Sequence, residues 1–260
     1  MKITVEKDTT LLAFLLDTMS NRSRTSVKSY LVHGQVAVNG CQTTRHDTLL
    51  VPGDIVEISM KRMPEVLHHP LLRIVYEDER LLVVDKRNGL LSVGTDKEQK
   101  RTAFYILSEH IKKNNRGARL FVVHRLDRET SGLMIYAKDQ TTQEILQRNW
   151  RSMVLDRRYV AVVENKLPNS EGIIDTILRE DRNCKVWASL NGAGERAVTH
   201  YSVLKEGKDY SLVELSLETG KKNKIRAHME WMHTQIAGDK KYSAASNPIG
   251  RVCLHAYKLC

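Results

Sequence analysis

Residues 121–138, FVVHRLDRETSGLMIYAK, hold the densest group of side chains in the chain that can do chemistry. Seven of the eight residues at 124–131 are polar, and apolar stretches lie on both sides of them. Asp127 stands between Arg125 and Arg128, so we expect positive charge to keep its carboxylate ionised and its pKa low. Such a carboxylate at the edge of a sheet can act as nucleophile or general base. On spacing alone, a charged hairpin loop with surface ion pairs is the more common explanation.

The segment HRLDRETSG (124–132) resembles the signature of the ribosomal large-subunit pseudouridine synthases of the RluA/RluD type. That pattern is His-Arg-Leu-Asp, two variable residues, then Thr-Ser-Gly, and every fixed position is present. Further blocks follow in the family's order, so the resemblance covers residues 71–260. The matching segments are IVYEDERLLVVDKRNGLLS (74–92), RRYVAVV (157–163), ETGKKNKIRAH (218–228), GDKKY (238–242) and LHAYKL (254–259).

The chain departs from the family pattern at a few positions. Arg87 stands where the family has proline, and Lys221, Asn223 and Lys224 replace arginine, histidine and glutamine. Because these changes keep or increase the positive charge, we expect them to affect the choice of target more than the chemistry. Family members usually continue beyond the last block, so we expect the chain to be short at its end, Cys260.

The resemblance implies an RNA pseudouridine synthase, which isomerises uridine without a metal, nucleotide or redox cofactor. It implies that Asp127 faces the ribose and that Arg226 is its charge partner. It also implies that Tyr159 stacks on the uracil and relays the proton of carbon 5. Whether Asp127 attacks the sugar or removes a sugar proton stays open. Taken alone, a tyrosine in an apolar strand is more typical of a protein core.

The target base has to leave the RNA stack, and a side chain has to fill the gap. By the resemblance, Arg125 fills it. His124 is equally compatible with contact to substrate and with a core histidine that forms hydrogen bonds. Arg157, in the place of a family lysine, and Lys224 are the other expected contacts to substrate in this part of the chain.

The N-terminal residues resemble a second family, the alpha-L RNA-binding motif shared with small-subunit ribosomal protein four. The matching segments are SRTSVKSYLVHGQVAVNG (23–40) and LLVPGDIVEI (49–58). Arg22, Arg24 and Lys28 are expected to form a basic helix face toward RNA phosphates. The alternative is a solvated helix end.

The segment MPEVLHHPLL (63–72) has two prolines and neither a helical nor a strand period, which indicates a linker. We therefore expect an RNA-binding module at 1–62, a linker at 63–70 and a catalytic domain at 71–260. Eight basic and seven acidic residues precede residue 71, so nine of the ten net positive charges belong to the larger domain.

The composition fits a globular protein, and on charge alone a nucleic-acid partner and a chain that is simply basic are equally compatible. The 260 residues are 41% hydrophobic, which is enough for a core, and the net charge of +10 suggests a polyanionic partner. No apolar run is long enough to span a membrane, and the start is a poor export signal, so we expect a cytoplasmic protein. Four cysteines without CxxC spacing suggest neither a zinc site nor a disulfide framework.

The elements that must position these residues follow from periodicity. Helices are predicted at 11–16 and 25–31, with Ser23 or Thr25 as the second cap, and a third from Asp139 toward Trp150. This mixture without a βαβ repeat predicts an α+β fold, with a mixed, largely antiparallel sheet and flanking helices. Strands are predicted in the segments 35–40, 55–59, 71–77, 81–86, 122–123, 132–137, 159–163, 185–190, 197–204 and 211–217.

Other functions remain open on the sequence alone. The chain could be an inactive RNA-binding factor for ribosome assembly, or a synthase directed at transfer RNA. An aspartate hydrolase such as a glycosidase fits less well, because those enzymes pair two carboxylates and Glu129 is the only near partner. The target uridine and the oligomeric state cannot be read from the sequence.

Overall fold

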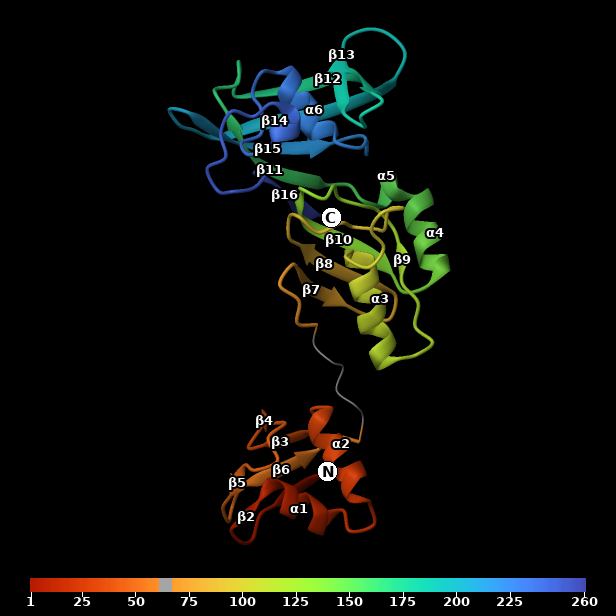
Figure 1. Cartoon of the computed structure of the whole chain (residues 1–260), viewed down its shortest axis with the longest axis vertical. Helices are drawn as coiled ribbons and strands as arrows, with labels where there is room; N and C mark the ends of the chain where they lie inside the picture. Colours follow the sequence, from red (N-terminus) through yellow and green to blue (C-terminus); the bar gives the residue numbers. More distant parts are fainter. Residues whose placement is uncertain (61–66) are drawn as a thin grey trace. The chain divides into compact units, whose positions relative to one another are not determined.

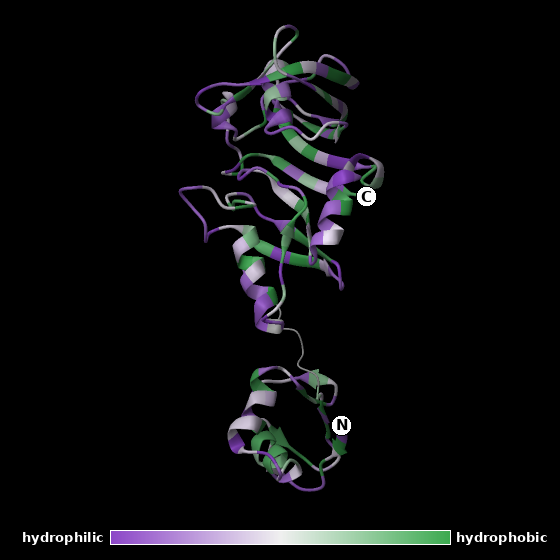
Figure 2. Ribbon diagram, turned by 90° about the vertical axis from the view of Figure 1, so that its right-hand side faces the viewer, coloured by the Kyte–Doolittle hydropathy of each residue, from purple (hydrophilic) through white to green (hydrophobic). Residues whose placement is uncertain are grey.

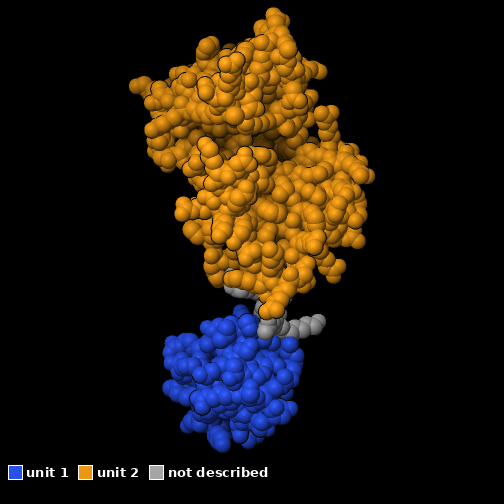
Figure 3. All heavy atoms as spheres, turned by 45° about the vertical axis from the view of Figure 1, so that its right-hand side comes forward, with its two compact units in different colours: residues 1–66 blue, residues 67–260 orange. Residues whose placement is uncertain are grey.

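The computed structural model describes residues 1–60 and 67–260. The chain divides into two compact units, residues 1–66 and residues 67–260 (Figure 3). Of the predicted linker, residues 63–66 lie outside the described residues. Leu67 already packs against the core of the larger unit, and His69 forms a β-bridge with Leu72.

The smaller unit combines two helices with short strands. Helix α1 (Leu11–Thr18) and helix α2 (Arg24–Val32) bury Leu11, Leu15, Val27 and Leu31 in one core. Of the two predicted caps, Ser23 is the one whose side chain accepts a hydrogen bond from the Ser26 amide. An antiparallel sheet runs in the order β1 (Lys2–Thr4), β6 (Ile55–Ile58), β3 (Val36–Val38), β4 (Cys41–Gln42), and a separate pair joins β2 (Thr9–Thr10) to β5 (Leu49–Leu50).

The larger unit is built on one ten-stranded sheet (Figure 1). Its path starts with β13 (Val186–Ser189), β12 (Glu171–Glu180), β14 (Glu195–Glu206), β15 (Tyr210–Leu217) and β11 (Arg157–Glu164). It continues with β16 (Leu254–Leu259), β10 (Ser131–Ala137), β8 (Leu81–Lys86) and β7 (Leu72–Glu77), and β9 (Phe121–Val122) pairs beside β10. Every pairing is antiparallel except that of β10 with β16. The predicted α+β fold is therefore confirmed.

Strand alternation explains how the sheet acquires its core. Residues of β8 and β15 alternate between buried and half-buried, because successive side chains of a strand point to opposite faces. Figure 2 colours the chain by hydropathy, and several strands of the larger unit carry hydrophobic and hydrophilic residues in turn. One cluster lies under β11, β15 and α6 (Lys224–Trp231), and a second lies between β8, β10 and α3 (Ala103–Asn114).

Two of the remaining helices begin at a residue whose side chain caps them. Helix α3 begins at Thr102, whose hydroxyl accepts from the Tyr105 amide, and α4 (Gln140–Arg148) begins at the predicted cap Asp139. Helix α5 (Trp150–Met153) and the 3-10 turn η1 (Lys240–Tyr242) complete the unit. No helix in the described part of the chain is long and apolar enough to cross a membrane.

Four elements near the site lay outside the strand and helix predictions: α3, β12, β16 and α6. Helix α3 does carry a helical pattern that the prediction missed, because Ala103, Leu107 and Ile111 are buried at intervals of four residues. Helix α6 buries Lys224, Arg226 and His228, so its buried positions are not all apolar and its sequence lacks the usual apolar stripe. The predicted strands at 71–86, 132–137, 159–163 and 211–217 are confirmed.

The parallel contact of β10 with β16 requires a glycine. Gly132 lies opposite Ala256 and has a φ of +126°. A Cβ on Gly132 would overlap the Ala256 backbone, including its nitrogen at 2.6 Å. The glycine of the HRLDRETSG segment therefore lets two strands approach closely next to the polar loop.

We expect Gly132→Ala to lower the free energy of unfolding of the larger unit by about 3 kcal/mol or more, because backbone strain and a clash with backbone atoms add. The matched control is Gly89→Ala, since Gly89 also has a positive φ (+85°) but open space around its Cα. Its expected cost is only about 1 kcal/mol. Equal losses in denaturant titrations of the two variants would contradict the close-approach argument.

Candidate active site

A cavity of about 610 Å³ brings together residues that are far apart in the sequence. Its wall comes from the loop at 123–130, from β11, from the β15–α6 loop with the start of α6, and from β16. Seven of the predicted site residues line it: His124, Arg125, Asp127, Arg157, Tyr159, Lys224 and Arg226. Arg22, Arg24 and Lys28 belong to the smaller unit and are exposed there.

Hydrogen bonds from the buried side chains of Ser92 and Lys86 hold the backbone of the loop at 123–130 in place. The Ser92 hydroxyl donates to the Leu126 carbonyl at 2.6 Å and accepts from the Leu126 amide at 3.1 Å. Lys86, fully buried, donates from Nζ to the carbonyls of Leu90 and Arg128, at 2.9 and 3.3 Å. The Leu126 side chain is buried in the second core cluster. These contacts fix the backbone on either side of Asp127, as a preorganised site requires.

The pKa of Asp127 is higher than its neighbouring arginines in the sequence suggested. Burial raises its pKa above the ordinary value, while the charges of Arg226, Arg125, Lys222 and Lys86 oppose that rise. The predicted lowering of its pKa was wrong, because desolvation outweighs the nearby cations. Arg128 faces elsewhere: its guanidinium pairs with Glu129 and donates to the Gly89 carbonyl.

Arg226 makes its closest ion pair with Asp239. Its Nε and Nη2 each lie 2.6 Å from an Asp239 carboxylate oxygen, and both side chains are almost fully buried. Nη1 donates to the Asn223 side chain at 3.1 Å, and the guanidinium lies 4.8 Å from the centre of the Tyr242 ring. Arg226 thus acts on Asp127 through its charge while Asp239 holds its orientation. Charge-assisted bidentate pairs of this kind are geometrically specific.

Tyr159 lies between the two core clusters and lines the cavity. It follows an irregularity in the β11–β16 register, at Arg158/Tyr159. Burial raises the pKa of its hydroxyl to about 12, with the Asp127 charge adding to the rise and Arg157 opposing it. The tyrosine is therefore neutral at physiological pH and keeps its proton for donation.

His124 forms the hydrogen bond that a core histidine would form. Its Nε2 accepts from the Ile135 amide at 3.0 Å, and its ring lies 4.7 Å from that of Trp150. Burial and the nearby Arg157 lower its pKa to about 4, so the ring is neutral. Arg125, by contrast, is exposed at the cavity and free to reach a substrate.

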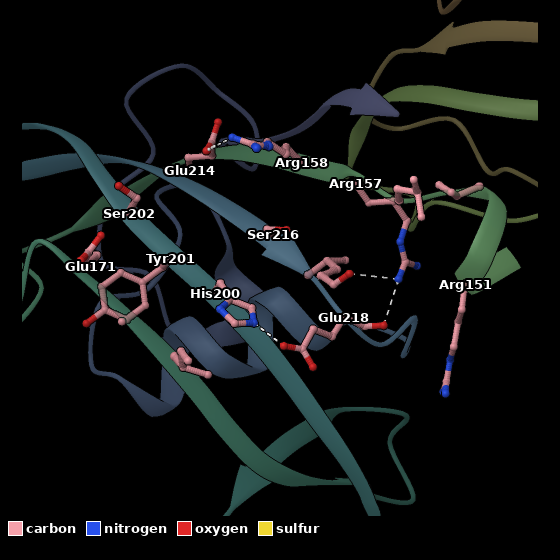
Figure 4. Close-up of a pocket in the computed structure, with 15 residues that line it drawn as sticks. Arg151, Arg157, Arg158, Glu171, His200, Tyr201, Ser202, Glu214, Ser216 and Glu218 are labelled. Carbon is pink, nitrogen blue, oxygen red and sulfur yellow. Dashed lines mark hydrogen bonds and ion pairs between the residues drawn. The ribbon is translucent and has the colours of Figure 1, made fainter. Parts of the chain in front are cut away.

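Arg157 lines this cavity and also a second one of about 840 Å³, whose lining residues are drawn in Figure 4. Its Nη2 donates to the carbonyls of Leu217 and Glu218, at 3.0 and 3.2 Å. The second cavity opens on the other face of β11, β14 and β15, where Arg158 pairs with Glu214 and His200 with Glu218. It contains none of the predicted catalytic residues, and two of its carboxylates, Glu214 and Glu218, are already bonded to Arg158 and His200.

Lys224 does not present its charge to the cavity. The side chain is buried, and Nζ donates to the Val198 carbonyl at 2.5 Å and to the Thr219 hydroxyl at 3.1 Å. Burial, helped by Arg157, lowers its pKa to about 7. This differs from the predicted contact with substrate, because the ammonium is already bound by the protein.

Sequence reasoning gave no role to Lys86, Ser92, Asp239 or Trp150, which support or line the cavity. Lys86, Ser92 and Asp239 lie inside the matching family blocks, and that position was the one available signal. Among the described residues, no three His, Cys, Asp or Glu side chains come together as metal ligands.

We expect Lys224→Gln, which restores the family residue, to remove part of the pH dependence of stability. Between about pH 7 and the unfolded pKa of 10.5, the unfolded chain binds a proton at Lys224 that the folded chain lacks. The unfolding free energy of the native chain should therefore rise with pH relative to the variant, by at most about 1.4 kcal/mol per pH unit. Parallel denaturation curves for the two proteins from about pH 6 to about pH 9 would contradict the assignment.

The comparisons with known proteins show which family the chain belongs to. The family model described as RNA pseudouridylate synthase matches residues 80–231. The uncharacterized RNA pseudouridine synthase YlyB of Bacillus subtilis is 35% identical over 236 residues, 88% of this chain and 77% of its own. The ribosomal large subunit pseudouridine synthase D of Vibrio cholerae is 32% identical over 225 residues, 85% and 68%. The solved structure of human RNA pseudouridylate synthase domain containing 4 is 26% identical, with a TM-score of 0.60 over 72% of this chain and 82% of that one. The chain therefore belongs to the RNA pseudouridine synthase family, in its RluA/RluD type.

Proposed function

We propose that this chain converts a specific uridine of large-subunit ribosomal RNA into pseudouridine, with Asp127 as the catalytic carboxylate. The observation that supports this most is the meeting of Asp127, Tyr159 and Arg226 at one cavity, although they lie on three separate segments. A volume of about 610 Å³ is in the usual range for a small-ligand site and can hold one flipped nucleoside.

In this proposal the reaction depends on the chain's own side chains. Asp127 acts on the ribose, either by attacking the sugar or by removing a sugar proton, and Arg226 favours its ionised form. The neutral hydroxyl of Tyr159 takes part in proton transfer at carbon 5, and its ring packs on the uracil.

Arg125 is the residue best suited to replace the flipped base. It lies two residues before Asp127 and its side chain is exposed. A guanidinium can stack on neighbouring bases as well as bind a phosphate. His124 already accepts a hydrogen bond from Ile135, and its ring lies tilted against that of Trp150, so in this scheme it is a neutral side chain in the cavity wall.

The ribosomal target rests on relatives that are named for the large ribosomal subunit. A cytoplasmic location belongs to the same proposal. We further propose that the smaller unit binds structured RNA. Arg24 and Lys28 lie one turn apart on α2, both are exposed, and neither has an ion-pair partner in the described residues.

Asp127→Asn should abolish isomerisation and leave folding and most RNA binding intact, because the amide is isosteric but cannot serve as nucleophile or base. The proposal as a whole is tested by a pseudouridine map of ribosomal and transfer RNA from cells with and without the gene, complemented by each variant. A uridine modified with the native chain and not with Asp127→Asn is the expected result. Wild-type turnover by the variant would overturn the catalytic role, and a mark only in transfer RNA would overturn the ribosomal target.

Arg24→Glu and Lys28→Glu should each weaken binding to structured RNA and lower the salt slope of log Kd by about 1, since each removes a phosphate contact. The control is Lys7→Glu, an exposed lysine of the same unit that lies outside α2. An effect of equal size at Lys7 would point to bulk charge rather than to a binding face.

A further inference from the structure

Glu164 is a buried carboxylate that has no role in the proposed reaction. It is the last residue of β11, is 8% exposed, and has no ion-pair partner among the described residues. Its Oε1 accepts from the amide and the hydroxyl of Ser246, at 2.6 and 2.5 Å, and Oε2 accepts from the Ala245 amide at 3.0 Å. Burial alone would disfavour the charge, but these donors outweigh it and lower the pKa of Glu164.

The segment that Glu164 holds is bonded directly to the residues around Asp239. The Gly238 amide donates to the Ser246 carbonyl at 2.8 Å, and the Ala244 amide donates to the Asp239 carbonyl at 3.1 Å. Gly238, with a φ of +83°, is packed so closely that a Cβ would overlap the Arg251 carbonyl. Residues 238–239 thus have little room to move while 244–246 stay in place.

The opposite side of the same segment lies against β11. The Ala237 amide donates to the Val162 carbonyl at 2.9 Å, and the Glu164 amide donates to the Gln235 carbonyl at 2.8 Å. Residues 235–239 therefore lie between the strand and the turn at 244–246, and the Glu164 side chain fastens that turn to the strand. Asp239, at the end of the segment, is the bidentate partner of Arg226.

We infer that Glu164 is a positioning residue for the reaction: its carboxylate fixes the turn at 244–246, the turn fixes Asp239, and Asp239 fixes Arg226 beside Asp127. This inference rests on the proposed function of Asp127. Glu164 and Tyr159 lie on the same strand, β11, so this strand positions Tyr159 directly and Arg226 through Glu164.

The charge environment of Asp127 gives a readout that a purely structural role would not change. Four nearby cations favour the ionised form of Asp127: Arg226, Arg125, Lys222 and Lys86. Two tyrosines, Tyr159 and Tyr242, also interact electrostatically with its carboxylate. If Arg226 moves away, the pKa of Asp127 rises. Activity that needs the carboxylate is then lost at a higher pH as the solution is acidified.

The test compares Glu164→Gln with Glu206→Gln in the full chain, by kcat against pH on a substrate stem-loop. Glu206 is an exposed glutamate of the same unit, paired with Lys166. For Glu164→Gln we expect the acid limb of kcat to move up by about 0.5 pH unit or more, with KM changed less than about two-fold. The control should follow the native profile. A fall in kcat by one factor at every pH, or an unshifted limb, would overturn the inference, since lost folding lowers kcat uniformly.

Two further measurements keep the inference testable if Glu164→Gln fails to fold or if the native chain shows no activity. Ser246→Ala removes only the hydroxyl donor to Glu164 and should shift the limb in the same direction, by less. Amide hydrogen exchange at residues 238–246, which needs no activity, should be faster in Glu164→Gln than in Glu206→Gln. Equal exchange rates would overturn the positioning role. Absence of pseudouridine with the native chain would overturn the proposed function instead.

Discussion

The close approach of β10 to β16 is the constraint on which the rest of the catalytic unit depends. In the strand order, this pairing alone joins β7, β8 and β10 to the other half of the ten-stranded sheet. It comprises two residue pairs, Ser131 with His255 and Gly132 with Ala256. Ser131 adds a hydrogen bond from its hydroxyl to the Leu254 carbonyl at 3.2 Å, and Arg251 donates to that hydroxyl at 2.9 Å. We call this contact of two residue pairs between β10 and β16 the seam. Residues from both sides of the seam line the cavity.

This placement explains why the catalytic groups come from both halves. The loop that carries Asp127 leads into β10, on one side of the seam, whereas Tyr159 and Arg226 belong to β11 and α6 on the other side. Any change in the seam would alter the distance between the carboxylate and its partners. Preorganised electrostatic groups lose much of their effect when such distances change, so a glycine at the seam serves the chemistry as well as the fold.

In the site, burial disfavours charged side chains, and hydrogen bonds and ion pairs to those side chains offset that cost. Three basic side chains, Lys86, Lys224 and Arg226, are almost completely buried, and each is hydrogen-bonded to carbonyls, a hydroxyl or a carboxylate. Buried charges without partners would be strongly unfavourable, so these hydrogen bonds are a condition for keeping them. The same burial that makes Asp127 harder to ionise also strengthens the attraction of every cation around it.

The sequence by itself determined the local features of this protein. The strands at 81–86 and 211–217, the cap at Asp139, and the HRLDRETSG segment are readable because they depend on near neighbours. The α+β class and the family followed from them.

Only the tertiary structure decided how the site residues behave. Asp127 has a raised pKa because desolvation depends on the whole fold, and flanking arginines could not reveal it. Arg226 pairs with Asp239 thirteen residues away, and the Lys224 ammonium bonds to Val198, twenty-six residues away. Helix α6 escaped prediction for the same reason. Its polar residues are buried against partners on β12, on β14 and at Asp239, and local periodicity carries no information about partners so far along the chain.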